Sequence, residues 1–172
     1  MDNLEYEILK EIGYYNTLPC TFNGFIDIPS LSDDKIHLVC TGKNDANLQK
    51  LWISVPNYDF AIYNAGEKIG EVNLRIGYND FLYYSGQISY MIDERYRGNG
   101  YAVRACRLIE PVARAHELSK LLIAVAPNNA ASIRVCEKLK ARFVRVAPLP
   151  EWHDRYGADG LYHRNIYAYD IR

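Results

Sequence analysis

The segment from Glu94 to Glu110, ERYRGNGYAVRACRLIE, combines residues that suit an anion-binding site. Gly98 and Gly100 flank one asparagine, two arginines precede them, and an apolar pattern at helical spacing follows. The first N–H groups of a helix have no partners within it, and glycines let a backbone approach a phosphate closely. The segment therefore predicts either a phosphate-binding loop or an ordinary surface turn with solvated arginines.

Two familiar nucleotide-binding loops do not fit this segment. A P-loop requires G-x-x-x-x-G-K-[ST], which the sequence lacks. A dinucleotide-binding loop requires G-x-G-x-x-G/A, and Val103 occupies the third small position here. That fold also needs several parallel βαβ units, whereas the preceding residues predict an antiparallel meander. A dinucleotide-dependent oxidoreductase is therefore a weaker alternative, which thermal-shift titration with NAD(P) and CoA would test.

A second segment some thirty residues on, APNNAASIRVCEKLKARF, predicts another helix. Its first residues include Asn128 and Asn129, which favour the cap of a helix N-terminus. RYRGNG, Arg95 to Gly100, also fits the pattern Q/R-x-x-G-x-G/A. With both motifs in this order, the sequence from about Phe60 to Arg172 resembles the GNAT superfamily of acyl-CoA-dependent N-acetyltransferases. The form of the second motif is that of the ribosomal-protein N-terminal acetyltransferases.

The resemblance implies that acetyl-CoA is the co-substrate and that no metal takes part. Loop amides are expected to bind the pyrophosphate, with Arg95 at the Q/R position. The backbone of Tyr90 to Ile92 is expected to pair with the two amides of pantetheine, as an added strand would. The implied cofactor-binding residues are Tyr90, Met91, Ile92, Arg95, Arg97, Gly98, Asn99, Gly100, Tyr101, Ala102, Asn129 and Ser132.

The implied reaction is direct transfer of an acetyl group to a primary amine, which needs a proton donor for the departing thiolate. Many family members place a tyrosine one turn after the Ser/Ala position of the second helix, but this sequence has Cys136 there. A thiol, with a reference pKa near 8.5, is a weaker hydrogen-bond donor than a phenol. Cys136 therefore fits either a catalytic thiol or a buried core residue. Ser132 fits either a proton donor and cofactor contact or a first-turn capping residue.

Two residues are candidates for the base that deprotonates the amine. Glu71 lies on the polar face of a predicted strand, where it can accept a proton directly or form an ordinary cross-strand ion pair. His153 belongs to the loop PEWHDRYGADG, which in the family borders the acceptor site, and a histidine titrates near neutral pH. The neighbouring Trp152 fits either an acceptor contact or an anchor for that loop.

The elements expected to position these residues form an α/β (α+β) fold, with a mixed, mostly antiparallel sheet of about six to seven strands. A central strand–helix–strand crossover and a splayed cofactor cleft complete the expected GNAT fold. Pro111 is expected to kink the helix predicted over Gly100 to Glu117. NDFLYYSG, from Asn79, is expected to be a plain connection. Strands are predicted within 35–40, 58–64, 69–78, 87–92, 120–126, 141–149 and 161–172, and a second helix within 128–140.

The N-terminal region is the least regular part of the sequence. Family members usually have two helices between their first two strands, and Lys35 to Phe60 leaves little room for them. We expect one domain over 1–172, with residues 1–34 as an atypical extension in which Asn3 to Gly13 favours a short helix. A second helical turn is predicted over Asp45 to Trp52.

Composition limits the classes of protein that this sequence can be. With 172 residues and a formal net charge of −1, the chain suits one globular domain without a general attraction to nucleic acid or membranes. The four cysteines form no C-x-x-C pair, and no apolar segment reaches the roughly 18 residues of a membrane span. We expect a cytoplasmic acetyltransferase acting on a small-molecule or peptide amine, with a homodimer left open. The alternative is a non-catalytic GNAT-fold module that binds acyl-CoA.

Overall fold

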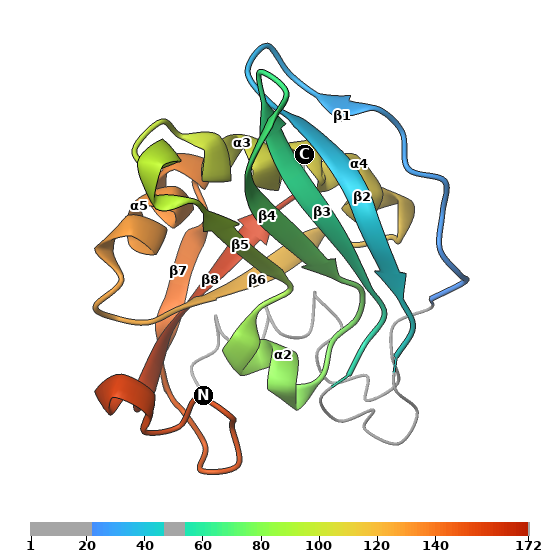
Figure 1. The fold of residues 1–172 in the computed structure, drawn as a ribbon. Coiled ribbons are helices and arrows are strands. Elements are labelled where there is room, and N and C mark those ends of the chain that lie inside the picture. Colours follow the sequence, from blue (N-terminus) through green and yellow to red (C-terminus); the bar gives the residue numbers. More distant parts are fainter. Residues whose placement is uncertain (1–21, 47–53, 172) are drawn as a thin grey trace.

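The computed structural model describes residues 22–46 and 54–171, which form two antiparallel sheets with helices packed against them (Figure 1). The short helix predicted over Asn3 to Gly13 lies outside these residues, as does most of the helical turn predicted over Asp45 to Trp52. The larger sheet has the order β1-β2-β3-β4-β5, and the smaller has the order β6-β8-β7.

The larger sheet is the meander that alternation in the sequence predicted. Its strands are β1 (Leu31–Ser32), β2 (His37–Asn44), β3 (Asn57–Asn64), β4 (Glu67–Arg75) and β5 (Ile88–Ile92). In β4, Val72 and Leu74 are buried while Glu71 is exposed on the other face. Because alternate residues of a strand face opposite sides, one face of this sheet joins the core and the other is polar.

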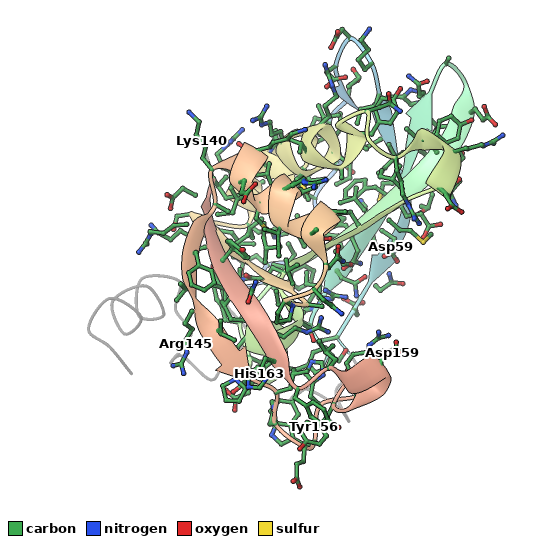
Figure 2. The ribbon with its side chains drawn as sticks, turned by 90° about the vertical axis from the view of Figure 1, so that its left-hand side faces the viewer. Asp59, Lys140, Arg145, Tyr156, Asp159 and His163 are labelled. Atoms are coloured by element: carbon green, nitrogen blue, oxygen red, sulfur yellow. The ribbon has the colours of Figure 1, made fainter. Side chains whose placement is uncertain are left out.

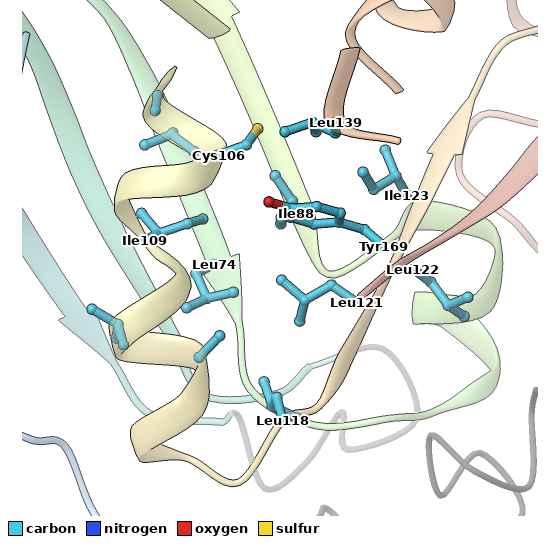
Figure 3. Packing of buried hydrophobic residues seen from close by; sticks show 14 of the residues in the cluster. Leu74, Ile88, Cys106, Ile109, Leu118, Leu121, Leu122, Ile123, Leu139 and Tyr169 are labelled. Carbon is cyan, nitrogen blue, oxygen red and sulfur yellow. The ribbon is translucent and has the colours of Figure 1, made fainter. Parts of the chain in front are cut away.

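Two short helices cover the inner face of the larger sheet. They are α3 (Tyr101–Leu108) and α4 (Glu110–Ala115), and they meet at Ile109, with Pro111 in the first turn of α4. Proline has no N–H to donate and is tolerated in the first turn, so a new helix starts here. The single helix predicted over Gly100 to Glu117 is therefore divided at Ile109, two residues before Pro111. Figure 3 shows Cys106 and Ile109 of this pair facing Leu74, Ile88 and Leu121 in the core.

The smaller sheet consists of β6 (Lys120–Val125), β7 (Arg142–Pro148) and β8 (His163–Asp170), with α5 (Ala130–Leu139) between β6 and β7. Two short 3-10 helices lie in connections, η2 (Glu94–Tyr96) and η3 (Ala158–Gly160). The expected α+β architecture with a central strand–helix–strand crossover is confirmed. The strands divide into two sheets, and all their pairings among the described residues are antiparallel.

The division between the sheets occurs directly after Gln87. Its backbone N–H donates to the Leu122 carbonyl (2.9 Å), and its side-chain Oε1 accepts the Leu122 N–H (2.5 Å). Gln87 is fully buried, and its amide also donates to the Gly77 carbonyl (3.0 Å). From Ile88 onwards β5 pairs with β4 and belongs to the larger sheet. The hydrogen bonds of Gln87 therefore fix the point from which β5 and β6 diverge.

One helix was missed in the sequence. NDFLYYSG is not a plain connection, because α2 (Asp80–Ser85) forms there and packs near β6 and β8. The Asn79 side chain accepts the Leu82 N–H (2.8 Å), and Leu82 and Tyr83 are buried. The asparagine cap was a usable sequence signal, but a helix of this length shows too few apolar repeats to be told from a turn.

Candidate active site

A cleft of about 540 Å³ opens where the two sheets diverge, between β5, the segment after η2 and α5. Of the residues expected to bind cofactor, all except Arg95 and Asn99 line this cleft. The lining residues are Tyr90, Met91, Ile92, Tyr96, Arg97, Gly98, Gly100, Tyr101, Ala102, Val103, Asn129, Ala131, Ser132, Arg134, Val135 and Lys138. The glycine loop and the second helix, thirty residues apart in sequence, thus face one cavity.

The N-terminus of α3 presents free donors to this cleft. The first hydrogen bond within the helix runs from the Arg104 N–H to the Gly100 carbonyl (3.2 Å). The three N–H groups that precede Arg104 therefore have no carbonyl acceptor within the helix. Gly100 caps the helix in the left-handed conformation (φ 79°) and has no side chain to bond them. Gly98 also has positive φ (84°). An added Cβ would meet no atom at either glycine, so backbone conformation and access to the amides are what require glycine.

Three basic residues line the cleft, and no acidic residue does. Arg97 is held by a hydrogen bond from its Nε to the Ile92 carbonyl (3.1 Å). Arg134 and Lys138 were missed as site residues and treated only as outward-facing positions. Their signal was spacing, because Ala131, Arg134 and Lys138 recur at i, i+3 and i+7 and so share one face of α5.

Arg95 and Asn99 brace the loop from outside the cleft. The Arg95 guanidinium pairs with the Glu67 carboxylate and lies 4.7 Å from the centre of the Tyr96 ring. The Asn99 amide donates to the carbonyls of Tyr96 (3.0 Å) and Arg97 (3.3 Å). Their side chains therefore act on the loop itself.

The start of α5 closes the cleft near β5. The Asn129 side chain accepts the Ser132 N–H (3.0 Å), which confirms that Asn129 caps the helix. The Tyr90 hydroxyl is buried and has no hydrogen-bond partner among the described residues. Burial raises the pKa of Tyr90, and the neighbouring Ser132 opposes that rise. The Tyr90 phenol, on β5, thus lies near Cys136, which is the position on α5 where many family members have a tyrosine.

Cys136 lies in the core and does not line the cleft. Its side chain is fully buried, and burial raises the pKa of its thiol to about 12. A thiol with so high a pKa and no access to the cleft is suited to packing. Of the two readings of Cys136, the structure supports the buried core residue.

His153 is likewise engaged in packing. Its ring is 3% exposed and stacks on Phe81 with centroids 5.3 Å apart. Its Nε2 lies 3.0 Å from Ser85 Oγ, and its Nδ1 accepts the Arg155 N–H and lies 3.1 Å from an Asp154 carboxylate oxygen. Burial lowers the pKa of His153. Both ring nitrogens are occupied and the residue lines neither cavity, so the structure gives His153 no geometry for a base.

A second cavity, of about 400 Å³, lies on the polar face of the larger sheet. Glu71 lines it, and its carboxylate accepts a hydrogen bond from the Lys68 ammonium (2.6 Å). Tyr90 and Met91 line both cavities, so β5 forms the wall between them. The lining residues are Thr41, Asp59, Phe60, Glu71, Val72, Asn73, Ser89, Tyr90 and Met91.

This second cavity contains residues that sequence reasoning missed. Asp59, Asn73 and Ser89 lie side by side, because Asp59 is opposite Asn73 and Asn73 is opposite Ser89 in the register. Gly70 allows the close pairing, since an added Cβ would lie 2.2 Å from the Met91 carbonyl oxygen. A period-two pattern puts Glu71 on the polar face of β4, but the register that brings Asp59 beside it is not readable from sequence.

Residues 22–46 and 54–171 contain neither a cluster of metal ligands nor a helix that could span a membrane. No group of three or more His, Cys, Asp or Glu side chains is arranged there to hold a metal ion. No helix in the same ranges is long and apolar enough to cross a membrane.

Comparison with known families identifies the family of this chain. The model of the acetyltransferase (GNAT) domain family matches residues 32–142, which is well over half of the chain. None of the curated proteins matches the sequence significantly.

Solved structures share the fold at low sequence identity. RimL, the ribosomal L7/L12 alpha-N-protein acetyltransferase, superposes with a TM-score of 0.59 at 14% identity, over 86% of this chain and 100% of that chain. The ribosomal-protein-S5-alanine acetyltransferase of Vibrio fischeri gives 0.59 at 15% identity, over 84% and 97%. The microcin C7 self-immunity acetyltransferase MccE, solved with acetyl-CoA and AMP, gives 0.53 at 19% identity, over 67% and 61%.

Proposed function

The chain belongs to the GNAT acetyltransferase family, and on that premise we propose how its two cavities divide the work of an N-acetyltransferase. The enzyme moves an acetyl group from acetyl-CoA to an amine. The observation that carries the assignment of roles is the shared wall: β5 borders a cleft lined by cations and a cavity lined by carboxylates. Donor and acceptor can therefore approach the same strand from opposite sides.

The cleft fits an anionic cofactor. The amides at the start of α3 are oriented toward one region without side-chain caps, and Arg97, Arg134 and Lys138 supply positive charge. Helix N-termini and guanidinium groups both favour phosphate oxygens. We assign the amides of Gly98 to Ala102 to the pyrophosphate and the three cations to the phosphates. Arg95 and Asn99 preserve the loop shape.

The residues near β5 are assigned to the reacting end. Acetyl-CoA supplies the acetyl group as an activated thioester. Backbone groups of Tyr90 to Ile92 hold the pantetheine and orient the thioester carbonyl. Ser132, which lines the cleft at the start of α5, donates a hydrogen bond to the departing thiolate, which then takes its proton from solvent. The buried phenol of Tyr90 lies beside that hydroxyl.

The second cavity is assigned to the acceptor amine. Glu71 lies directly opposite Met91 in the register of β4 and β5, so its carboxylate lies beside the shared wall. It accepts the proton that the attacking amine loses, directly or through one water. Lys68, bonded to the same carboxylate, orients it.

The similar structures suggest one acceptor class. RimL and the Vibrio fischeri enzyme are both named as acetyltransferases of ribosomal proteins. A protein or peptide N-terminus is therefore a proposed acceptor here, beside small-molecule amines. A cytoplasmic location, a homodimer and a single domain over 1–172 also remain predictions.

The proposed function is tested by measuring CoA thiol release from acetyl-CoA over a panel of amines. Release that depends on an added amine, with acetylated product found by mass spectrometry, is the expected result. Tight acetyl-CoA binding with no release on any amine would favour the non-catalytic acyl-CoA-binding module. Thermal stabilisation by NAD(P) and not by CoA would contradict the cofactor assignment.

A further inference from the structure

The acceptor cavity has a polar floor built from two aligned rows of side chains. One row contains Glu71 and Met91, and the next contains Asp59, Asn73 and Ser89. Asp59 and Glu71 are diagonal neighbours on adjacent strands, at a spacing of about 7–8 Å. The cavity therefore has one carboxylate beside the shared wall and a second one farther along the sheet.

Asp59 differs from Glu71 in what holds it. Asn73 Nδ2 donates to one carboxylate oxygen (2.6 Å), and Asn44 Nδ2 donates to the other (2.7 Å). Both donors are neutral, and Asp59 has no ion-pair partner among the described residues. Glu71, by contrast, is paired with Lys68. The amides orient the Asp59 carboxylate without forming an ion pair with it.

The surroundings of Asp59 favour a cation in the cavity. No lysine, arginine or histidine lines it. Arg75 is close enough for Asp59 to raise its pKa, although burial lowers that pKa more strongly. Its guanidinium donates to the Gly86 carbonyl (3.0 Å), and the residue does not line the cavity. Figure 2 shows Asp59 on the larger sheet, away from Tyr156 and Asp159 at the far end.

We propose that Asp59 binds a second positive charge on the acceptor, so that the enzyme prefers amines carrying another cationic group over neutral or acidic amines. This rests on the proposed function of the cavity. The reacting amine lies beside Glu71 at the wall, and the second ammonium reaches Asp59. An ammonium can form charge-assisted hydrogen bonds with a preoriented carboxylate. A carboxylate on the acceptor would meet like charge there.

Three acceptors of equal chain length test this preference. 1,4-Diaminobutane, butylamine and 4-aminobutyrate differ only in ending with an ammonium, a methyl or a carboxylate group. The expected order of kcat/KM is diamine, monoamine, amino acid, with about 10- to 100-fold between the first two. Equal rates for the first two, or a preference for 4-aminobutyrate, would overturn the proposal.

Asp59→Asn removes the charge and Asp27→Asn is its matched control, since Asp27 is exposed and lines neither cavity. D59N should bring the ratio of kcat/KM for the diamine to that for butylamine close to one, and D27N should keep the wild-type ratio. If D59N does not fold, Thr41→Lys places an ammonium at an exposed lining position and should reverse the order of diamine and amino acid. A retained diamine preference in either variant would contradict the proposal.

A binding measurement separates this proposal from the proposed function. Calorimetry of 1,4-diaminobutane with the CoA-loaded protein needs no turnover, and heat lost in D59N supports the cation site even if no thiol is ever released. Absence of diamine binding to wild type overturns it. Peptides with lysine or glutamate at the second position show whether the cationic acceptor is a peptide or a small amine. A preference for the lysine peptide that is lost in D59N indicates a peptide acceptor. A preference for the diamine without a preference between the peptides indicates a small amine.

Discussion

The two cavities on either side of β5 have opposite charge on a chain that is nearly neutral overall. The cofactor cleft is lined by three basic residues and no acidic one, whereas the acceptor cavity is lined by two carboxylates and no basic residue. The net charge of −1 conceals this separation, because it sums over both faces. Charge patterning around one strand therefore says more about the partners of this protein than the overall balance does.

The cavities also differ in what presents their polar groups. The cleft relies on backbone amides at a helix start, positioned by glycines, with cations around them. The acceptor cavity relies on side chains aligned by strand register. Substitutions at the two sites should therefore change different quantities. Those in the cleft should alter the affinity for acetyl-CoA, and those in the acceptor cavity should alter turnover or the choice of acceptor.

Glu71→Gln should have the largest effect and should act on turnover alone. The amide keeps the shape but cannot accept a proton, so kcat should fall by about 100-fold. Affinity for acetyl-CoA, measured by calorimetry, should be unchanged because Glu71 does not line the cleft. An unchanged kcat would remove Glu71 from the mechanism.

Gly100→Val should weaken acetyl-CoA binding by about tenfold or more, without unfolding the protein. A β-branched residue disfavours the positive φ at this cap and shields the amides of α3. The dissociation constant and the circular dichroism spectrum are the two measurements. Gly98→Val should behave similarly, and wild-type affinity in both variants would contradict the pyrophosphate assignment.

Lys138→Ala should raise the dissociation constant of acetyl-CoA about threefold to tenfold, more at low salt than at high salt. Lys140→Gly is the matched control, because it removes the same charge from a residue that lies outside the cleft (Figure 2). Lys140 has a left-handed backbone (φ 59°) that glycine tolerates well. Equal losses in both variants would mean that Lys138 acts only through the overall charge.

His153→Gln should have the smallest effect and should change stability alone. Burial lowers the pKa of His153 in the folded protein, so the unfolded state binds protons more readily as pH falls below about 6.5. Stability is therefore highest above that pH and declines below it. Melting temperatures at pH 7.5 and 5.5 should show a smaller decline in the variant. If kcat fell while the drop in melting temperature between pH 7.5 and 5.5 stayed the same, His153 would have a catalytic role.

The sequence predicted the fold well, along with the two segments that line the cleft beside β5, because both depend on local signals. Gly98, Gly100 and Asn129 occupy positions that their own conformational preferences favour, and Pro111 lies in the first turn of a new helix. These signals act within a few residues. The resemblance to a known family then placed the two segments at one cleft.

The acceptor cavity could not be predicted as a unit, because it depends on register and packing between distant segments. Asp59 and Ser89 are brought together only when β3, β4 and β5 align. His153 suited a base by its chemistry, but it packs on Phe81 in a buried position that no local pattern indicated. Cys136 is a similar case. The sequence left a catalytic thiol and a buried core residue open there, and only the packing of the folded protein shows that the side chain is fully buried.

A crystal structure of the protein with CoA and 1,4-diaminobutane would test the central claim most directly. The account predicts phosphate oxygens on the amides at the start of α3, with the thiol end at Tyr90 and Met91. It predicts the diamine on the other side of β5, with one nitrogen near Glu71 and the other on the Asp59 carboxylate. CoA phosphates bound away from α3, or a diamine bound on the same side of β5 as CoA, would contradict it.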